Sequence, residues 1–208
     1  MEISTWYILA QLMGVITICF EFASYQIQNQ RKYLLVTSIG NVFWALMFVF
    51  LGLHVNMQSV LIMIIAALFG TFRGLIWYWI FAKNTEKRRI AGRVVLYVSL
   101  AIVLVSTSRV IYNLPLPQQQ IIQTLGLLGG MLFIIGQYLP SKHYLRAFVT
   151  FYAIMVLIGQ TPLNLIDGDK TSWNVMGILI ETAKIVSVIV FYCRMMLAKK
   201  EVAEQQQS

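Results

Sequence analysis

The chain has 208 residues, of which 59% are hydrophobic and only 12% are charged. Soluble domains carry about 25% charged residues, so this composition excludes an ordinary soluble enzyme, a disordered chain and a disulfide-stabilised scaffold. The net charge of +8 would suit a nucleic-acid-binding protein, but in a chain this apolar the positions of the charges decide what they mean. The composition predicts an integral membrane protein.

Long apolar segments bounded by polar residues predict seven membrane-spanning helices. The runs are too long and continuous for the alternating strands of a transmembrane barrel. The polar tail Glu201–Ser208 is expected to fray. In chain order the predicted spans are Trp6–Ile27, Tyr33–Leu53, Ser59–Phe81, Val94–Ile111, Gln119–Leu139, Tyr144–Ile158 and Trp173–Leu197.

Lysine and arginine residues gather in alternate connections. Only Arg109 and Lys170 lie in the opposite connections, so the positive-inside rule predicts an amino terminus outside and a carboxy terminus in the cytoplasm. Trp6 and Trp173 open spans on the predicted outer side, as is typical of interfacial tryptophans. Topology thus accounts for the basic residues, and no nucleic-acid partner is expected. The residues that mark the inner side are Arg31, Lys32, Lys83, Lys87, Arg88, Arg89, Arg93, Lys142, Arg146, Arg194, Lys199 and Lys200.

Short patterns recur at a spacing of about 110 residues, which indicates an internal repeat. The recurring patterns are Gln11-x-x-Gly14 with Gln123-x-x-Gly126, Phe43–Met47 with Phe151–Met155, and Thr71–Arg73 with Thr182–Lys184. The repeat predicts an all-α fold with three helices in residues 1–82, a linker helix in 83–117, three helices in 118–198 and a polar tail in 199–208. Because one linker span intervenes, the halves are parallel, and substrate sites in such 3+1+3 folds lie near mid-membrane between the halves.

The first half also resembles a known family. Ile8-Leu9-Ala10-Gln11-x-x-Gly14-Val15-Ile16, Phe50-Leu51-Gly52 and Ala67-Leu68-Phe69-Gly70-Thr71-Phe72-Arg73 resemble helix patterns of the YgjV-like bacterial inner-membrane proteins. The match extends more weakly to spans five to seven, and this family resembles the SWEET, PQ-loop and PnuC-type transporters. The resemblance implies a protein of the bacterial inner (cytoplasmic) membrane that transports a small solute such as a vitamin, nucleoside or sugar.

Four charged residues lie inside predicted spans: Glu21, Arg73, Glu181 and Lys184. Each costs about 2.5–3.5 kcal/mol in a bilayer unless it has a partner or water. Glu21, Arg73 and Lys184 each precede a basic residue at the inner boundary by 10 residues, or about 15 Å of helix, near mid-membrane. We expect two ion pairs, Glu21 with Arg73 and Glu181 with Lys184, which either bind a solute or only fix helix register.

Polar and aromatic residues on the same spans are weaker candidates for a substrate site. The repeat partners Trp44 and Tyr152 could stack on a planar ligand, or they could simply pack against helices and lipid. The other candidates at such a site are Asn41, Tyr25, Gln26 and Gln137.

These observations leave three functional hypotheses. The first is a small-solute transporter or facilitator that rocks one repeat against the other about a mid-membrane site. The second is a microbial-rhodopsin-like retinal protein with Lys184 as the Schiff base, and the third is a scaffold or channel subunit with purely structural ion pairs. The chain carries no metal-ligand spacing, nucleophile elbow or phosphate-binding loop, so neither enzymatic activity nor a cofactor is expected for the leading hypothesis. Expected partners are the small-molecule substrate and the lipid bilayer, and a homo-oligomer stays open.

Overall fold

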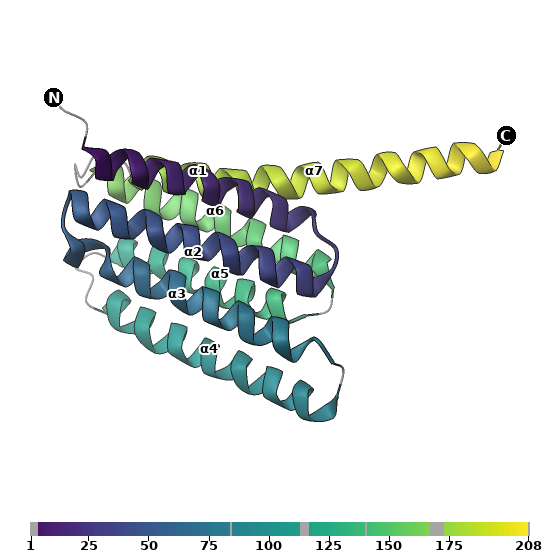
Figure 1. The fold of residues 1–208 in the computed structure, drawn as a ribbon, viewed down its shortest axis with the longest axis horizontal. Helices are drawn as coiled ribbons and strands as arrows, with labels where there is room; N and C mark the ends of the chain where they lie inside the picture. Colours follow the sequence, from purple (N-terminus) through teal and green to yellow (C-terminus); the bar gives the residue numbers. More distant parts are fainter. Residues whose placement is uncertain (1–3, 84, 113–116, 140, 167–172, 208) are drawn as a thin grey trace.

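The computed structural model describes residues 4–83, 85–112, 117–139, 141–166 and 173–207, and these residues form seven α-helices (Figure 1). Parts of the topology and repeat predictions fall outside the described residues. They involve all of Lys170 and the side chains of Gln123, Lys142, Trp173 and Lys200. The helices are α1 Thr5–Gln26, α2 Gln30–His54, α3 Met57–Ile80, α4 Glu86–Tyr112, α5 Pro117–Tyr138, α6 Lys142–Ile166 and α7 Trp173–Gln207.

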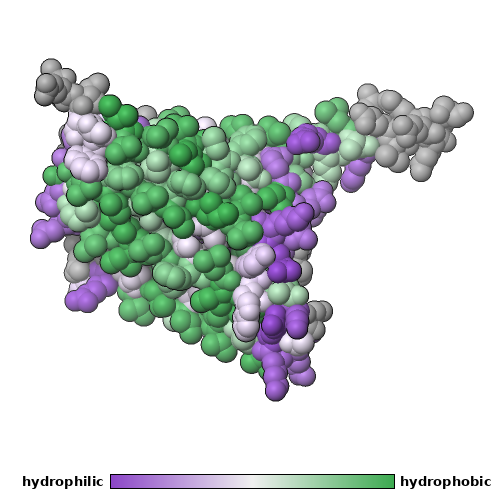
Figure 2. All heavy atoms as spheres, viewed as in Figure 1, coloured by the Kyte–Doolittle hydropathy of each residue, from purple (hydrophilic) through white to green (hydrophobic). Residues whose placement is uncertain are grey.

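The surface of the helical bundle is strongly apolar. Five helices, α1 to α4 and α7, are long and apolar enough to cross a membrane by length and composition, and α5 and α6 contain shorter apolar stretches. Figure 2 shows apolar residues covering the flank of the bundle, with hydrophilic residues gathered at its ends. Ile65, Phe72 and Val105 are all more than half exposed. A soluble monomer rarely exposes so large a contiguous apolar surface.

The limits of four helices, α1, α2, α3 and α5, lie within three residues of the predicted spans. Three helices are longer than predicted, because a prediction from apolar runs leaves out helical turns that contain polar or charged residues. Thus α4 begins at Glu86 in a basic segment, and α6 continues past Ile158 to Ile166. The fraying expected for the tail is wrong, since α7 continues to Gln207 without a glycine or proline to end it.

Helices that follow one another in the chain are also neighbours in space. Each packs on the next, with the least contact between α3 and α4, and α1 closes the series by packing on α7. In this order α2 separates α1 from α3, and α6 separates α5 from α7. Which side chains can meet therefore depends on how the helices pack, and not only on how far along its helix each residue lies.

Two apolar clusters fill the interior. The larger draws on all seven helices and includes Tyr25, Tyr33, Trp77, Leu145 and Val188. The smaller lies among α1, α2, α3 and α7 and contains Ala10, Met47, Phe48, Leu51, Val60 and Met176. Since burial against apolar neighbours has no preferred direction, these clusters hold the helices together without setting their rotation.

Glycine permits a close approach of α5 and α6. A methyl group built on Gly136 would lie 2.9 Å from Cα of Leu145, a backbone atom that cannot move without shifting α6. Gly126 on the same helix has nothing within 4 Å of the equivalent position, so it provides a matched comparison.

We expect Gly136→Ala to lower the free energy of unfolding by about 1–3 kcal/mol, because the added methyl forces the two helices apart. Gly126→Ala should be neutral or stabilising by up to about 1 kcal/mol, because alanine is the better helix former. Thermal unfolding of the detergent-purified protein measures both. Equal losses at the two positions would contradict the close packing of α5 on α6.

Candidate functional site

Two acids and one lysine meet where α1 packs on α7. Lys184 Nζ donates a hydrogen bond to Glu181 Oε1 at 2.7 Å, which confirms the ion pair predicted one helical turn apart. Glu21 on α1 interacts electrostatically with both residues. All three side chains are buried. We call Glu21, Glu181 and Lys184 the acidic pole, since it holds two carboxylates and one ammonium group.

Tyr152 on α6 borders the acidic pole. The Lys184 Nζ lies 5.6 Å from the centroid of the Tyr152 ring, an arrangement in which the ring face attracts the cation. The ring also stacks on that of Phe133 on α5, at 6.1 Å between centroids. The structure therefore brings Tyr152 together with three of the predicted charges.

Trp44 and Asn41 lie in other surroundings. Trp44 packs edge-on against Phe48 of its own helix, at 5.5 Å between ring centroids, beside the smaller apolar cluster. Asn41 Nδ2 fills the space beside Gly70 of α3, where a Cβ atom would be 2.9 Å away. Among the described residues no ring contact joins Trp44 to Tyr152, so the position of Trp44 favours its packing alternative over a shared aromatic stack.

Arg73 on α3 forms the second polar group. Its Nη2 donates a hydrogen bond to Gln137 Oε1 on α5 at 2.9 Å, and Gln137 Nε2 donates to the Tyr33 hydroxyl on α2 at 3.4 Å. The guanidinium carbon lies 5.6 Å from the Phe69 ring and 5.7 Å from the Trp77 ring. Arg73 is only 7% exposed and Gln137 only 3%. We call Arg73 and Gln137 the basic pole.

The predicted pair of Glu21 with Arg73 is wrong. The one salt bridge in the described part of the chain joins Lys184 to Glu181, and Arg73 contacts the neutral Gln137 instead of Glu21. The reason is how the helices pack: α1 packs on α7, where Glu21 lies near Lys184, whereas Arg73 on α3 reaches Gln137 on α5. Two charges at one depth are not neighbours unless their helices are.

Two tyrosines connect the poles. Tyr25 lies one turn from Glu21 on α1, and its ring contacts that of Tyr33 at 5.9 Å between centroids. Tyr33 in turn accepts the hydrogen bond from Gln137. A buried polar chain therefore crosses the bundle interior from α7, through α1 and α2, to α5 and α3. Its members are Lys184, Glu181, Glu21, Tyr25, Tyr33, Gln137 and Arg73.

Arg146 on α6 is a buried residue that sequence reasoning placed at the membrane surface. It is 2% exposed, and its Nε donates to the Tyr25 carbonyl at 3.1 Å and its Nη2 to the Ile27 carbonyl at 3.4 Å. The guanidinium carbon also lies 3.3 Å from the centroid of the Phe191 ring. Carbonyls at the end of a helix lack intrahelical partners, and Arg146 supplies donors for two of them at the end of α1.

Two glutamines make similar contacts at the same end of the bundle. Gln26 Nε2 donates to the carbonyl of Ser187 at 2.6 Å and to its hydroxyl at 2.8 Å. Gln30 Nε2 lies 3.1–3.3 Å from three carbonyls that end α5, those of Gln137, Tyr138 and Leu139. We call Gln26, Gln30, Arg146 and Ser187 the end seal, because each contact joins residues 1–82 to residues 118–198.

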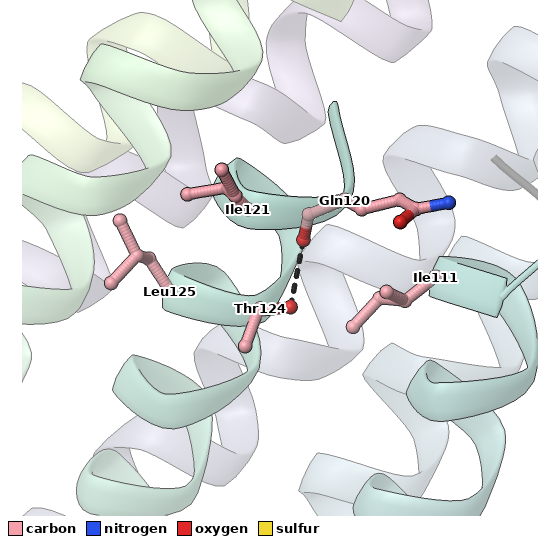
Figure 3. Close-up of a pocket in the computed structure, with 5 residues that line it drawn as sticks. All are labelled: Ile111, Gln120, Ile121, Thr124 and Leu125. Carbon is pink, nitrogen blue, oxygen red and sulfur yellow. Dashed lines mark hydrogen bonds between the residues drawn. The ribbon is translucent and has the colours of Figure 1, made fainter. Parts of the chain in front are cut away.

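A surface pocket lies far from these residues. It measures about 380 Å³, and it is lined by Ile111, Gln120, Ile121, Thr124 and Leu125 of α4 and α5. Thr124 Oγ1 donates to the carbonyl of Gln120 on its own helix at 2.7 Å, as drawn in Figure 3. Leu125 precedes Gln137 by three turns of α5, or roughly 18 Å. The mostly apolar lining and this separation exclude the pocket from the candidate site.

In the described ranges no group of His, Cys, Asp or Glu side chains is arranged to hold a metal ion. Comparison of the chain with protein-family models, with curated proteins and with solved structures returns no match. The family resemblance therefore stays a prediction from the sequence.

We expect Lys184→Gln to destabilise the protein more than Glu181→Gln does. Loss of the ammonium group leaves two buried carboxylates without a counter-charge, which costs about 3–5 kcal/mol, whereas loss of Glu181 leaves Lys184 to compensate Glu21. Lys199→Gln on the exposed part of α7 is the control and should change the unfolding temperature little. The assignment of Lys184 to both acids fails if Glu181→Gln is the more damaging change.

Proposed function

We propose that this chain is a multi-pass protein of the bacterial inner membrane, with its amino terminus outside and its carboxy terminus in the cytoplasm, that transports a small polar solute. Five helices long and apolar enough to span a membrane support the membrane assignment. Twelve basic residues follow the odd-numbered spans, which supports the orientation. Connections α1–α2, α3–α4 and α5–α6 lie at the same end of the bundle, as this orientation requires (Figure 1).

The contacts between the two halves support the 3+1+3 arrangement. In the second half, Lys184 on the third helix faces Glu21 on the first helix of the other half. In the first half, Arg73 on the third helix faces Gln137 on the first helix of the other half. Arg73 and Lys184 are also the positions that the internal repeat matches. Equivalent residues thus meet equivalent helices, as expected for two parallel repeats related by an axis along the membrane normal.

The polar chain is the observation that carries the transport proposal. It joins both halves and holds four charged residues inside an apolar bundle, where a charge without a function is expensive to keep. Solute sites of repeat-built transporters lie at such an interface between the halves. A vitamin, nucleoside, sugar or similar metabolite would bind there through its polar groups.

The end seal indicates how access to this site would alternate. Hydrogen bonds of Arg146, Gln26 and Gln30 close the basic, cytoplasmic end between the halves. Nearer the opposite end the halves meet through apolar packing, with the Met176 sulfur 3.0 Å from a Cβ built on Gly14. Rocking of one half against the other would break the end seal and open the cytoplasmic side, while water replaces the lost hydrogen bonds.

A thermal-stability screen of the detergent-purified protein against vitamins, nucleosides, sugars and amino acids tests this proposal. A solute that binds only the folded protein raises the unfolding temperature, by about 2.7 kcal/mol of stabilisation at one hundred times its Kd. We expect Arg73→Gln and Glu181→Gln to abolish the shift, and Arg89→Gln, an exposed change, to preserve it. A solute whose effect survives both site variants would place the binding site elsewhere.

A retinal protein is the second candidate, favoured by a buried lysine on the last helix with a carboxylate 2.7 Å from its ammonium nitrogen. Such a carboxylate could serve as counter-ion to a protonated Schiff base. Purification with added all-trans-retinal distinguishes the two candidates. A visible absorption band that disappears in Lys184→Ala would replace the transporter proposal, and the absence of a band removes this candidate.

A further inference from the structure

We propose that the polar chain binds a zwitterion, a small solute with one cationic amine and one anionic carboxylate. This inference rests on the proposed transport function and narrows its substrate class. The amine would lie at the acidic pole and the carboxylate at the basic pole, so the solute would bridge the two halves of the protein.

The acidic pole has an unmatched carboxylate. Lys184 donates to Glu181 Oε1, and this ammonium is the single cation among the three residues of the pole. Glu21 Oε2 and Glu181 Oε2 are buried and have no hydrogen-bond partner in the described part of the chain. A buried carboxylate oxygen without a donor is costly, and an alkylammonium group offers three donors and the missing positive charge.

The basic pole lacks a negative charge. The hydrogen bond of Arg73 to Gln137 satisfies one guanidinium nitrogen but adds no negative charge. Arg73 Nε is buried without a hydrogen-bond partner among the described residues. The guanidinium group is planar, and it recognises a carboxylate better than any other side chain does. An anionic group of a solute would therefore complete the surroundings of Arg73.

The two poles share a neighbour in Tyr33. The Tyr33 hydroxyl interacts electrostatically with Glu21 on one side and with Arg73 on the other. A sugar or a neutral nucleoside would supply neither the positive charge that the acidic pole lacks nor the negative charge that the basic pole lacks. A solute with a single charge would pair with one pole and leave the charge of the other pole unpaired. An unpaired buried charge weakens binding, and this difference favours a zwitterion over singly charged solutes.

A matched series of probes tests the zwitterion. The zwitterions are glycine, β-alanine, 4-aminobutyrate and 6-aminohexanoate, which differ in the distance between amine and carboxylate. Butylamine and butyrate carry the same groups singly. We expect at least one zwitterion to raise the unfolding temperature of the detergent-purified protein and to bind at least about tenfold more tightly than either singly charged probe, as one charge-assisted hydrogen bond implies.

Variants at each pole then identify the groups that bind. Arg73→Gln should weaken binding of the stabilising zwitterion by about tenfold or more, and so should Glu21→Gln, whereas Arg73→Lys should retain part of it. The control Glu86→Gln, at the exposed start of α4, should leave the affinity unchanged. Arg73→Lys also distinguishes a loss of binding from a folding defect, because it preserves the positive charge of the basic pole.

Three results overturn the inference. Zwitterions that stabilise no more than butylamine and butyrate would exclude a two-pole site. Equal binding to the native protein and to both pole variants would place the zwitterion elsewhere. If instead a neutral sugar or nucleoside stabilises the protein and Arg73→Gln abolishes its effect, the transport proposal stands and the zwitterion is wrong.

Discussion

A charged side chain inside an apolar bundle must reach a polar group, and this requirement sets how the helices of this protein face one another. Lys184 turns α7 toward Glu21 on α1, and Arg73 turns α3 toward Gln137 on α5. The apolar clusters cannot do this, because lipid is as apolar as the leucine and valine side chains that fill them. The rotation of each helix about its axis therefore depends on a small number of polar contacts.

The two ends of the bundle are held together by different forces. At the basic end, donors on Arg146 and Gln30 bind carbonyls that end α1 and α5, and these groups would be hydrated if the halves separated. Such contacts contribute little net free energy where water can replace them. Near the other end, Met176 fills the space beside Gly14, and separation there would leave a gap. The basic end can thus open more readily than the other end.

Contacts between residues close in the chain are the ones that the sequence predicts correctly. The pair of Glu181 with Lys184 follows from three residues of helical spacing, and most helix limits follow from hydropathy. The partner of Arg73 depends on which helices are neighbours, which no spacing specifies. Arg146 looks the same in sequence whether it faces solvent or caps the end of another helix. Only a signal for helix order, such as residues that change together in related chains, would have identified both.

The packing of α1 on α7 also has a consequence for how this protein is made. Gln26 on α1 and Ser187 on α7 form a hydrogen bond and are 161 residues apart in the chain. At ordinary translation rates of about 5–20 residues per second, Gln26 is therefore made roughly ten to thirty seconds before Ser187. In the proposed membrane protein, Glu21 would reside in the bilayer without Lys184 during that interval. The ring of helices can close only when synthesis of the last helix is complete, and until then the first helix depends on the insertion machinery or on water at the membrane surface to shelter its carboxylate.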